Sequence, residues 1–146
     1  MSEDSLLKTI ASLIQDEAAV TQELLERLRE RDGQVGLLLR VLSRRPEVFV
    51  PHVMQGARLY HAPKAIDPKT AELAAVAAAA ALMCDHCLEA HMRAARRKGA
   101  TLEEIFDVLL IAGAVAESST LSVAFRKFRQ MEGNENETQG SDLRGV

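Results

Sequence analysis

Reactive side chains concentrate in one short segment, MCDHCLEAH, at residues 83–91. Both cysteines of the chain lie here, with His86 between Cys84 and Cys87 and with His91 four residues after Cys87. On a helix, Cys84 and Cys87 occupy positions i and i+3, which places both sulfurs on one face and within the Cα separation that a disulfide accepts. The pair can therefore cycle between a dithiol and a disulfide.

His91 supplies a base beside this pair. At i+4 from Cys87 it lies on the same helical face, one turn further along. It can take the proton from Cys87 and leave the thiolate, which is the form that attacks an electrophile. A helix that begins at Cys84 or Asp85 would add N-terminal N–H groups and a dipole that favour negative charge on the sulfurs.

Two other interpretations use the same residues. The cysteines could be buried and inert, as thiols in protein cores often are. Cys84, Cys87 and His91 could also bind zinc or, between subunits, an iron–sulfur centre, but a structural zinc site takes four ligands. Outside the segment only His52 and His61 remain, and we expect them in loops rather than at a metal. The favoured expectation is no metal and no cofactor beyond the redox-active disulfide.

Glu72 is a further candidate, because it lies on an otherwise apolar segment that leads into Cys84. A carboxylate near a helix N-terminus often does no more than interact with the helix dipole. In one straight helix Glu72 would lie about 28 Å from His91, too far to help it. A chain that turns back near Met83 would bring the two side chains together. No Gly or Pro stands at that point, so local signals do not force the turn.

The composition narrows the class of protein. The chain has 146 residues and a formal net charge of −3, which suits one domain and gives no electrostatic reason for a nucleic-acid partner. The start, MSEDSLLKTI, carries acids where a secretory signal carries basic residues. The Ala-rich window AELAAVAAAAALMC is too short and too weakly apolar to cross a bilayer. We therefore expect a soluble, cytoplasmic protein with no membrane partner, in a compartment where structural disulfides are rare.

Helical periodicity runs through nearly the whole chain, so we predict an all-α fold, a helical bundle of about six helices. The Ala-rich segment should be its central element, with the CxxC motif at the start of a core helix. An interruption is expected between Lys69 and Lys98, because one helix of that length would be unusual. Three helices are predicted before this segment: at about 4–31, ending at Gly33; at 34–45; and from Pro46 to Tyr60, with a break or kink near Val50 caused by Pro51. The Ala-rich helix should start at an Asp67 N-cap with Pro68. A last helical region should start at a Thr101–Glu104 capping box, with a fresh start at ESST, residues 117–120.

These elements divide the chain into three expected parts. Residues 1–32 form an amphipathic N-terminal helix extension, and residues 33–131 form the helical domain that holds the reactive segment. Residues 132–146, EGNENETQGSDLRGV, have almost nothing to bury and are predicted to be a disordered polar tail.

The reactive residues together match a longer pattern. Glu72 followed by Cys84-x-x-Cys87-x-x-x-His91, with His86 just before the second cysteine, resembles the alkylhydroperoxidase D-like branch of the carboxymuconolactone decarboxylase family. Five residues at this spacing form a far more specific signature than a CxxC alone.

The resemblance extends from about Leu42 to Phe128 and includes RRPEVF, IDPKTAELAAVAAA and GATLEEIFDVLLIAGAVA. It implies an all-helical fold that assembles into trimers or hexamers, and thiol-based reduction of peroxides. The decarboxylase branch is similar in fold but lacks the cysteine pair, which argues against lactone decarboxylation here. The family's short members begin near residue 35, so the N-terminal helix is a departure whose partner the resemblance does not give.

By the family's pattern, Cys87 would be the peroxidatic thiol and Cys84 would resolve its sulfenic acid to a disulfide. His91 would take the proton from Cys87, Glu72 would orient His91 or relay protons to it, and His86 would assist. A dithiol protein or small thiol would then reduce the disulfide by exchange.

The expectation is thus a thiol-dependent peroxidase or disulfide oxidoreductase that acts on a hydroperoxide or disulfide. The alternatives are a metal- or iron–sulfur-binding redox or sensor protein, a non-redox carboxymuconolactone decarboxylase-like enzyme, and a non-catalytic helical assembly module.

Overall fold

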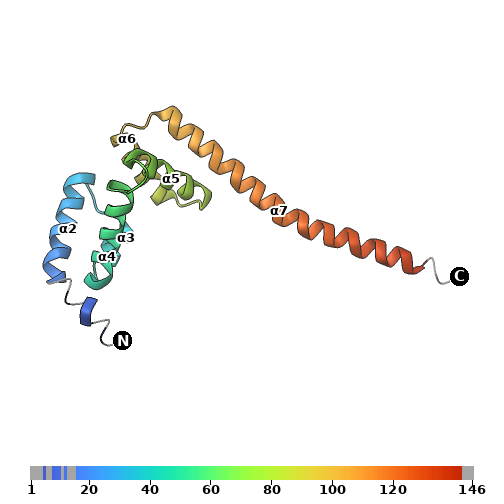
Figure 1. Ribbon diagram of the computed structural model, residues 1–146, viewed down its shortest axis with the longest axis horizontal. Helices are drawn as coiled ribbons and strands as arrows, with labels where there is room; N and C mark the ends of the chain where they lie inside the picture. Colours follow the sequence, from blue (N-terminus) through green and yellow to red (C-terminus); the bar gives the residue numbers. More distant parts are fainter. Residues whose placement is uncertain (1–4, 6–7, 11, 13–15, 143–146) are drawn as a thin grey trace. The chain divides into compact units, whose positions relative to one another are not determined.

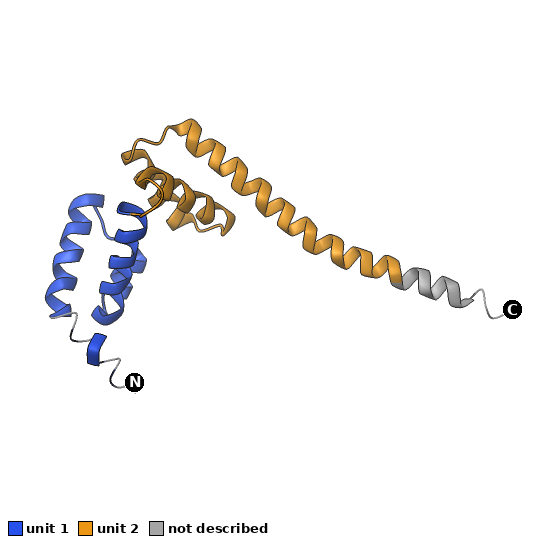
Figure 2. Cartoon of the chain, in the orientation of Figure 1, with its two compact units in different colours: residues 1–62 blue, residues 63–146 orange. Residues whose placement is uncertain are grey.

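The computed structural model describes residues 5, 8–10, 12 and 16–142, with side chains as far as residue 133. Every regular element in these ranges is helical (Figure 1), which confirms the all-α prediction. The chain divides into two compact units, residues 1–62 and 63–146 (Figure 2). The expected division into residues 1–32, 33–131 and 132–146 stays a prediction.

The first unit is built around α4 (Pro46–Gly56), which packs against α2 (Glu17–Asp32) and α3 (Leu37–Leu42). A short π-helix, η1 (Ala57–His61), continues directly from α4. Phe49 and Val50 of α4 are almost completely buried and anchor this unit. At its other end, a guanidinium nitrogen of Arg31 lies 3.1 Å from Nε2 of His61.

Two local predictions fail in this unit. The helix expected over 4–31 is interrupted at Asp16, which adopts a left-handed φ of 54° and accepts a hydrogen bond from the Ala19 N–H, so that α2 begins at Glu17. Residues 4, 6, 7, 11 and 13–15 of that expected helix lie outside the described residues. Of the break or kink expected near Val50, the break is absent, because α4 runs through Pro51. Burial of the residues just before this proline offsets the single helical hydrogen bond that it removes.

The second unit consists of α5 (Pro68–Ala81), α6 (Asp85–Arg97) and α7 (Leu102–Asp142), with α5 packed against both others. Its core is a small cluster of Val76, Ala95, Ala100 and Ile105, each at most 2% exposed. Alanine at most α5 positions lets the neighbouring helices approach closely, as the composition predicts. The predicted N-cap of α5 is confirmed, since the Asp67 carboxylate accepts a hydrogen bond from the Thr70 N–H.

The interruption expected somewhere in the long Ala-rich segment is confirmed and lies at residues 82–84, between the end of α5 and the start of α6. Met83 adopts a left-handed φ of 53°. The Met83 N–H donates to the Ala80 carbonyl at 3.0 Å and the Cys84 N–H donates to the Ala79 carbonyl at 2.9 Å. This pattern is a Schellman motif, which ordinarily has glycine at the left-handed position. Gly99 ends α6 through the same pair of bonds, with a φ of 88°.

The capping box that opens α7 is confirmed in both directions. The Glu104 N–H donates to the Thr101 hydroxyl and the Thr101 N–H donates to the Glu104 carboxylate. The fresh start expected at residues 117–120 is wrong, because α7 is continuous there. The Thr120 hydroxyl donates to the Ala116 carbonyl one turn earlier, which accommodates it inside the helix. The backbone of α7 continues through Asp142, across much of the segment from 132 where we expected a disordered tail.

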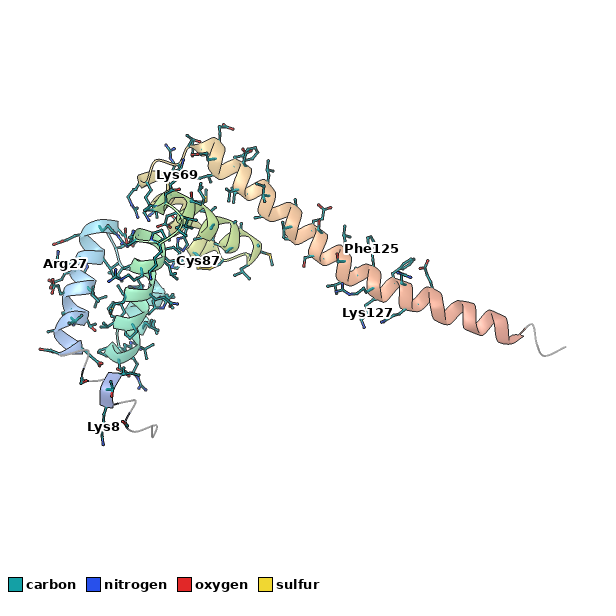
Figure 3. The ribbon with its side chains drawn as sticks, viewed as in Figure 1. Lys8, Arg27, Lys69, Cys87, Phe125 and Lys127 are labelled. Atoms are coloured by element: carbon teal, nitrogen blue, oxygen red, sulfur yellow. A yellow bond between two sulfur atoms is a disulfide. The ribbon has the colours of Figure 1, made fainter. Side chains whose placement is uncertain are left out.

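The apolar surface of α7 is mostly uncovered. Ile105 and Ala112 are buried against the rest of the unit, whereas every described side chain from Glu117 to Gly133 is exposed. By length and composition alone, Leu102–Gly133 could cross a membrane, and only 6% of its apolar window is buried. This apolar window is longer than the Ala-rich window of α5 that was considered from the sequence, and it was overlooked. Phe125 and Lys127 both project from its exposed half, which therefore carries basic as well as apolar side chains (Figure 3).

Candidate active site: a disulfide beside a buried carboxylate and a histidine

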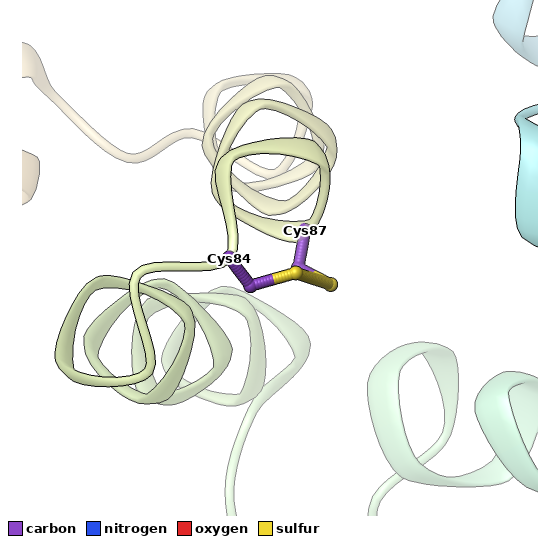
Figure 4. The surroundings of a disulfide bond; sticks show 2 residues. All are labelled: Cys84 and Cys87. Atoms are coloured by element: carbon purple, nitrogen blue, oxygen red, sulfur yellow. A yellow bond between two sulfur atoms is a disulfide. The ribbon is translucent and has the colours of Figure 1, made fainter.

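Cys84 and Cys87 are joined in a disulfide at the start of α6, with their Cα atoms 5.4 Å apart (Figure 4). Cys84 is the residue just before the helix and Cys87 lies in its first turn. Both residues are half-buried, so the bond lies near the surface rather than in the enclosed core. The proximity of the two thiols that the CxxC spacing predicts is confirmed, and the structure shows the pair in its oxidised form.

Glu72 and His91 meet across the turn at Met83. Oε2 of Glu72 lies 2.8 Å from Nδ1 of His91. Glu72 is 1% exposed, which makes it the buried carboxylate of this unit's described residues. Two interpretations of Glu72 were open from the sequence: interaction with the helix dipole alone, or contact with His91 after a turn near Met83. The structure supports the second.

This contact selects the form of the imidazole. A carboxylate only accepts hydrogen bonds, so an ionised Glu72 takes the hydrogen bond from an Nδ1–H. In the uncharged ring, Nε2 then carries the lone pair and is the nitrogen that can accept a proton. This tautomer is assigned from the hydrogen-bond partners. Because His91 is one turn after Cys87 on the same face of α6, this arrangement suits a base for that thiol.

Lys98 completes the surroundings of Glu72. Its Nζ lies 2.6 Å from Oε1 of the carboxylate, and its side chain is 18% exposed. Glu72 therefore divides its two oxygens between a histidine and an ammonium group. Lys98 was not predicted from the sequence, although its position at i+7 from His91 places it on the same helical face and could have indicated it.

His86 lies in the first turn of α6 and is exposed. It shares this turn with Cys87, which keeps it next to the disulfide in the chain. Its predicted assisting role stays a prediction. His52 and His61 are outside this unit, on α4 and η1 respectively, rather than in the loops expected for them.

A second ion pair fixes the start of α5 to the start of α7. Lys69 Nζ lies 2.8 Å from Glu104 Oε1. The hydrogen bond from Lys69 lowers the pKa of Glu104, and the same bond raises the pKa of Lys69. Hydrogen bonds from the Thr70 hydroxyl and N–H lower the pKa of the Asp67 cap. These contacts define where α5 begins, at Pro68, four residues before Glu72.

Within the described residues, no group of three or more His, Cys, Asp or Glu side chains is arranged to hold a metal ion. The two thiols that a metal would use are bonded to each other.

Comparison with known proteins places this geometry in a family. The sequence profile of the carboxymuconolactone decarboxylase family matches residues 51–130, more than half of the chain. The chain belongs to the carboxymuconolactone decarboxylase family. The match covers α5, α6 and the whole candidate site, so this member of the family carries a CxxC disulfide.

Two relatives refine the family assignment. The crystal structure of the alkylhydroperoxidase AhpD core from Rhodospirillum rubrum superimposes with a TM-score of 0.63 and 26% identity, covering 85% of this chain and 87% of that one. "Uncharacterized protein 4 in cox locus" of Paracoccus denitrificans is 39% identical over 56 residues, which are 38% of this chain. The match spans half the length of the Paracoccus protein. The resemblance to the alkylhydroperoxidase D-like branch is thereby confirmed.

Proposed function

We propose that this protein is a thiol-dependent peroxidase that reduces hydroperoxides through a dithiol–disulfide cycle of Cys84 and Cys87. The observation that carries the proposal is the closed disulfide, one cysteine of which shares a helical face with a histidine held by a buried carboxylate. The similarity to an alkylhydroperoxidase AhpD core, a protein named for this activity, supports it.

The chemistry follows from the geometry of α6. In the reduced protein, Nε2 of His91 takes the proton of the Cys87 thiol, and the thiolate attacks one oxygen of the hydroperoxide. The S–O bond forms as the O–O bond breaks, and the departing alkoxide takes the proton back from His91 and leaves as an alcohol. The Cys87 sulfenic acid is then attacked by the Cys84 thiol, which forms the disulfide and releases water.

The cycle closes by thiol–disulfide exchange. An external dithiol protein or small thiol donates two electrons, reduces the disulfide and is itself oxidised to a disulfide. If the reduced cysteine pair exchanges with a disulfide substrate instead of reacting with a peroxide, the protein acts as a disulfide oxidoreductase. The half-buried position of both cysteines supports access for either kind of substrate. His86 would assist from the exposed first turn of α6, and the cytoplasm, where thiol donors are abundant, is the proposed compartment.

We further propose that the protein works as a homo-oligomer, a trimer or hexamer, with α7 at the interface. Large apolar side chains of α7, among them Val115, Phe125 and Phe128, are exposed in the single chain, and an exposed apolar surface of this extent marks a protein–protein or membrane contact. Glu117 stands midway along the apolar stretch, where a charged side chain at the centre of a bilayer costs about 2.5–3.5 kcal/mol. The acidic residue and the neighbouring serines favour other copies of the chain over lipid as the cover.

Steady-state turnover tests the proposed function. The protein is supplied with a dithiol donor and either an organic hydroperoxide or a small disulfide, and substrate loss is followed for wild type, Cys87→Ser and Cys84→Ser. Both variants should lose turnover, but Cys84→Ser should still consume one equivalent of peroxide and form a Cys87 sulfenic acid. Full turnover by Cys87→Ser would overturn the proposal. An absorbance spectrum and metal analysis of protein purified without oxygen distinguish the iron–sulfur or zinc alternative, which requires bound metal.

A further inference from the structure

We propose that Lys98 is a positioning residue of the site: its ammonium group neutralises the buried carboxylate of Glu72 and thereby keeps His91 uncharged and able to accept a proton. The use that the protein makes of this arrangement rests on the proposed function. The ion pair of Lys98 with Glu72 is present in the folded chain, whatever substrate the protein acts on.

The geometry makes Lys98 the direct counter-ion of Glu72. The 2.6 Å contact between Nζ and Oε1 is a charge-assisted hydrogen bond, made where the side chains of Lys98 and Glu72 are only 18% and 2% exposed. Burial of a carboxylate is costly unless it is paired and hydrogen-bonded. Lys98 supplies that pairing, while Oε2 is left to hold His91.

Removal of the ammonium group would change where protons bind. Of its two partners Lys98 and His91, Glu72 would then keep His91. A protonated His91 imidazole would become the counter-ion of the carboxylate. An ordinary imidazole is more basic than an ordinary carboxyl by about two pH units, so the first proton bound by the pair goes to the ring. With Lys98 present, the carboxylate is already neutralised, and the nearby positive charge opposes a second one on His91.

Three other cationic groups of α5 and α6 have partners of their own. Lys69 of α5 is paired with Glu104 of α7. On α6, Arg93 pairs with the exposed Glu89. Next to Lys98, Arg96 donates to the Ala100 carbonyl. The disulfide beside His91 does not titrate in the oxidised protein. Lys98 is the cation that contacts the carboxylate holding His91, so its removal should alter the protonation of His91.

The test is an NMR titration of the His91 imidazole in the oxidised protein, with the signal assigned by its loss in His91→Gln. Lys98→Met should move the midpoint of the titration to higher pH by about one unit, a tenfold gain in proton affinity. Lys98→Arg keeps the charge and should restore the wild-type midpoint. Arg93→Met removes the same charge from the same helix, at the exposed Glu89 pair, and should leave the midpoint unchanged.

A Lys98→Met midpoint equal to that of wild type, or lower, would overturn the proposal. If Lys98→Met does not fold, the double variant Glu72→Gln/Lys98→Met decides. A folded double variant supports the proposal, because removal of the carboxylate removes the need for the cation, whereas a double variant that also fails to fold assigns Lys98 to packing and overturns it. No peroxide enters this measurement, so a protein without peroxidase activity would refute the proposed function and leave this result intact.

Discussion

Oε2 of Glu72 lies 2.8 Å from Nδ1 of His91, although nineteen positions separate the two residues in the chain. The relationship exists because α5 ends at Ala81 and α6 begins at Asp85 after a reversal at Met83. It fixes the orientation of the imidazole and leaves Nε2 as the nitrogen that can accept a proton. The proposed proton transfer from Cys87 therefore depends on a backbone turn as much as on the reactive side chains.

Substitution of the buried carboxylate should impair the reaction without unfolding the protein. Glu72→Gln keeps the shape of the side chain but removes the charge that holds the Nδ1–H tautomer, so peroxide kcat/KM should fall by about 100-fold. Glu89→Gln, an acidic residue in an exposed ion pair on α6, is the matched control and should retain wild-type kcat/KM. Equal rates for Glu72→Gln and the control would remove Glu72 from the mechanism.

Glycine should raise the free energy of unfolding at position 83, in the turn, and lower it at the neighbouring position 82. Met83 is 90% exposed and has a left-handed φ, which costs an L-residue about 1–2 kcal/mol, so Met83→Gly should raise the free energy of unfolding by up to about 1 kcal/mol. Leu82 is 77% exposed but has helical backbone angles, so Leu82→Gly should lower stability by about 0.5–1 kcal/mol.

Denaturant unfolding of the oxidised protein at one fixed protein concentration measures both changes. The same sign for Met83→Gly and Leu82→Gly would show that the left-handed position is not strained. A Met83→Val variant adds a β-branched side chain at the same φ and should be less stable than wild type.

Acid should weaken the junction between α5 and α7. The pKa of Glu104 is lowered by the Lys69 hydrogen bond, so the stabilisation from this pair is fully present above the unfolded-state pKa of a glutamate and is lost as pH falls through the lowered value. The lowered pKa of Asp67 acts in the same direction. Thermal melting from pH 7 to pH 3 should therefore show a fall in Tm that is smaller in Glu104→Gln. If Tm falls as much in Glu104→Gln as in wild type, the Lys69–Glu104 pair is not the source of the acid sensitivity.

The exposed apolar half of α7 should control assembly. Phe125 and Phe128 are each 58% exposed in the single chain, so Phe125→Glu/Phe128→Glu should shift the protein to smaller species. Light scattering coupled to size-exclusion chromatography measures the mass, and Gln130→Glu, a neighbouring exposed polar position, is the control. Wild-type protein that elutes as a monomer without detergent would refute the proposed interface.

Strong side-chain patterns made the fold of the second unit predictable. The Asp67–Pro68 start, the Thr101–Glu104 capping box and the CxxC proximity all depend on local hydrogen bonds or fixed helical spacing, and each is present. The reversal at Met83 was expected from helix length and not from its residues, because the left-handed position of the Schellman motif carries Met instead of Gly.

Each failure has its own physical cause. Asp16 adopts a left-handed conformation that periodicity does not reveal, and α4 continues through Pro51 because tertiary burial outweighs one lost hydrogen bond. Lys98 was overlooked because a single lysine near a helix end ordinarily interacts with the last carbonyls and not with a buried acid. Its role depends on the packing of α6 against α5, which the sequence alone does not specify.

The reaction of the reduced protein with one equivalent of an organic hydroperoxide tests the central claim most directly. Stopped-flow measurement of peroxide loss, combined with thiol counting and mass spectrometry, should show two thiols lost per peroxide and a new Cys84–Cys87 disulfide. The rate should exceed that of free cysteine at the same pH and should vanish in Cys87→Ser. A reduced wild-type protein that reacts no faster than free cysteine, or a Cys87→Ser variant that reacts at the wild-type rate, would contradict the account.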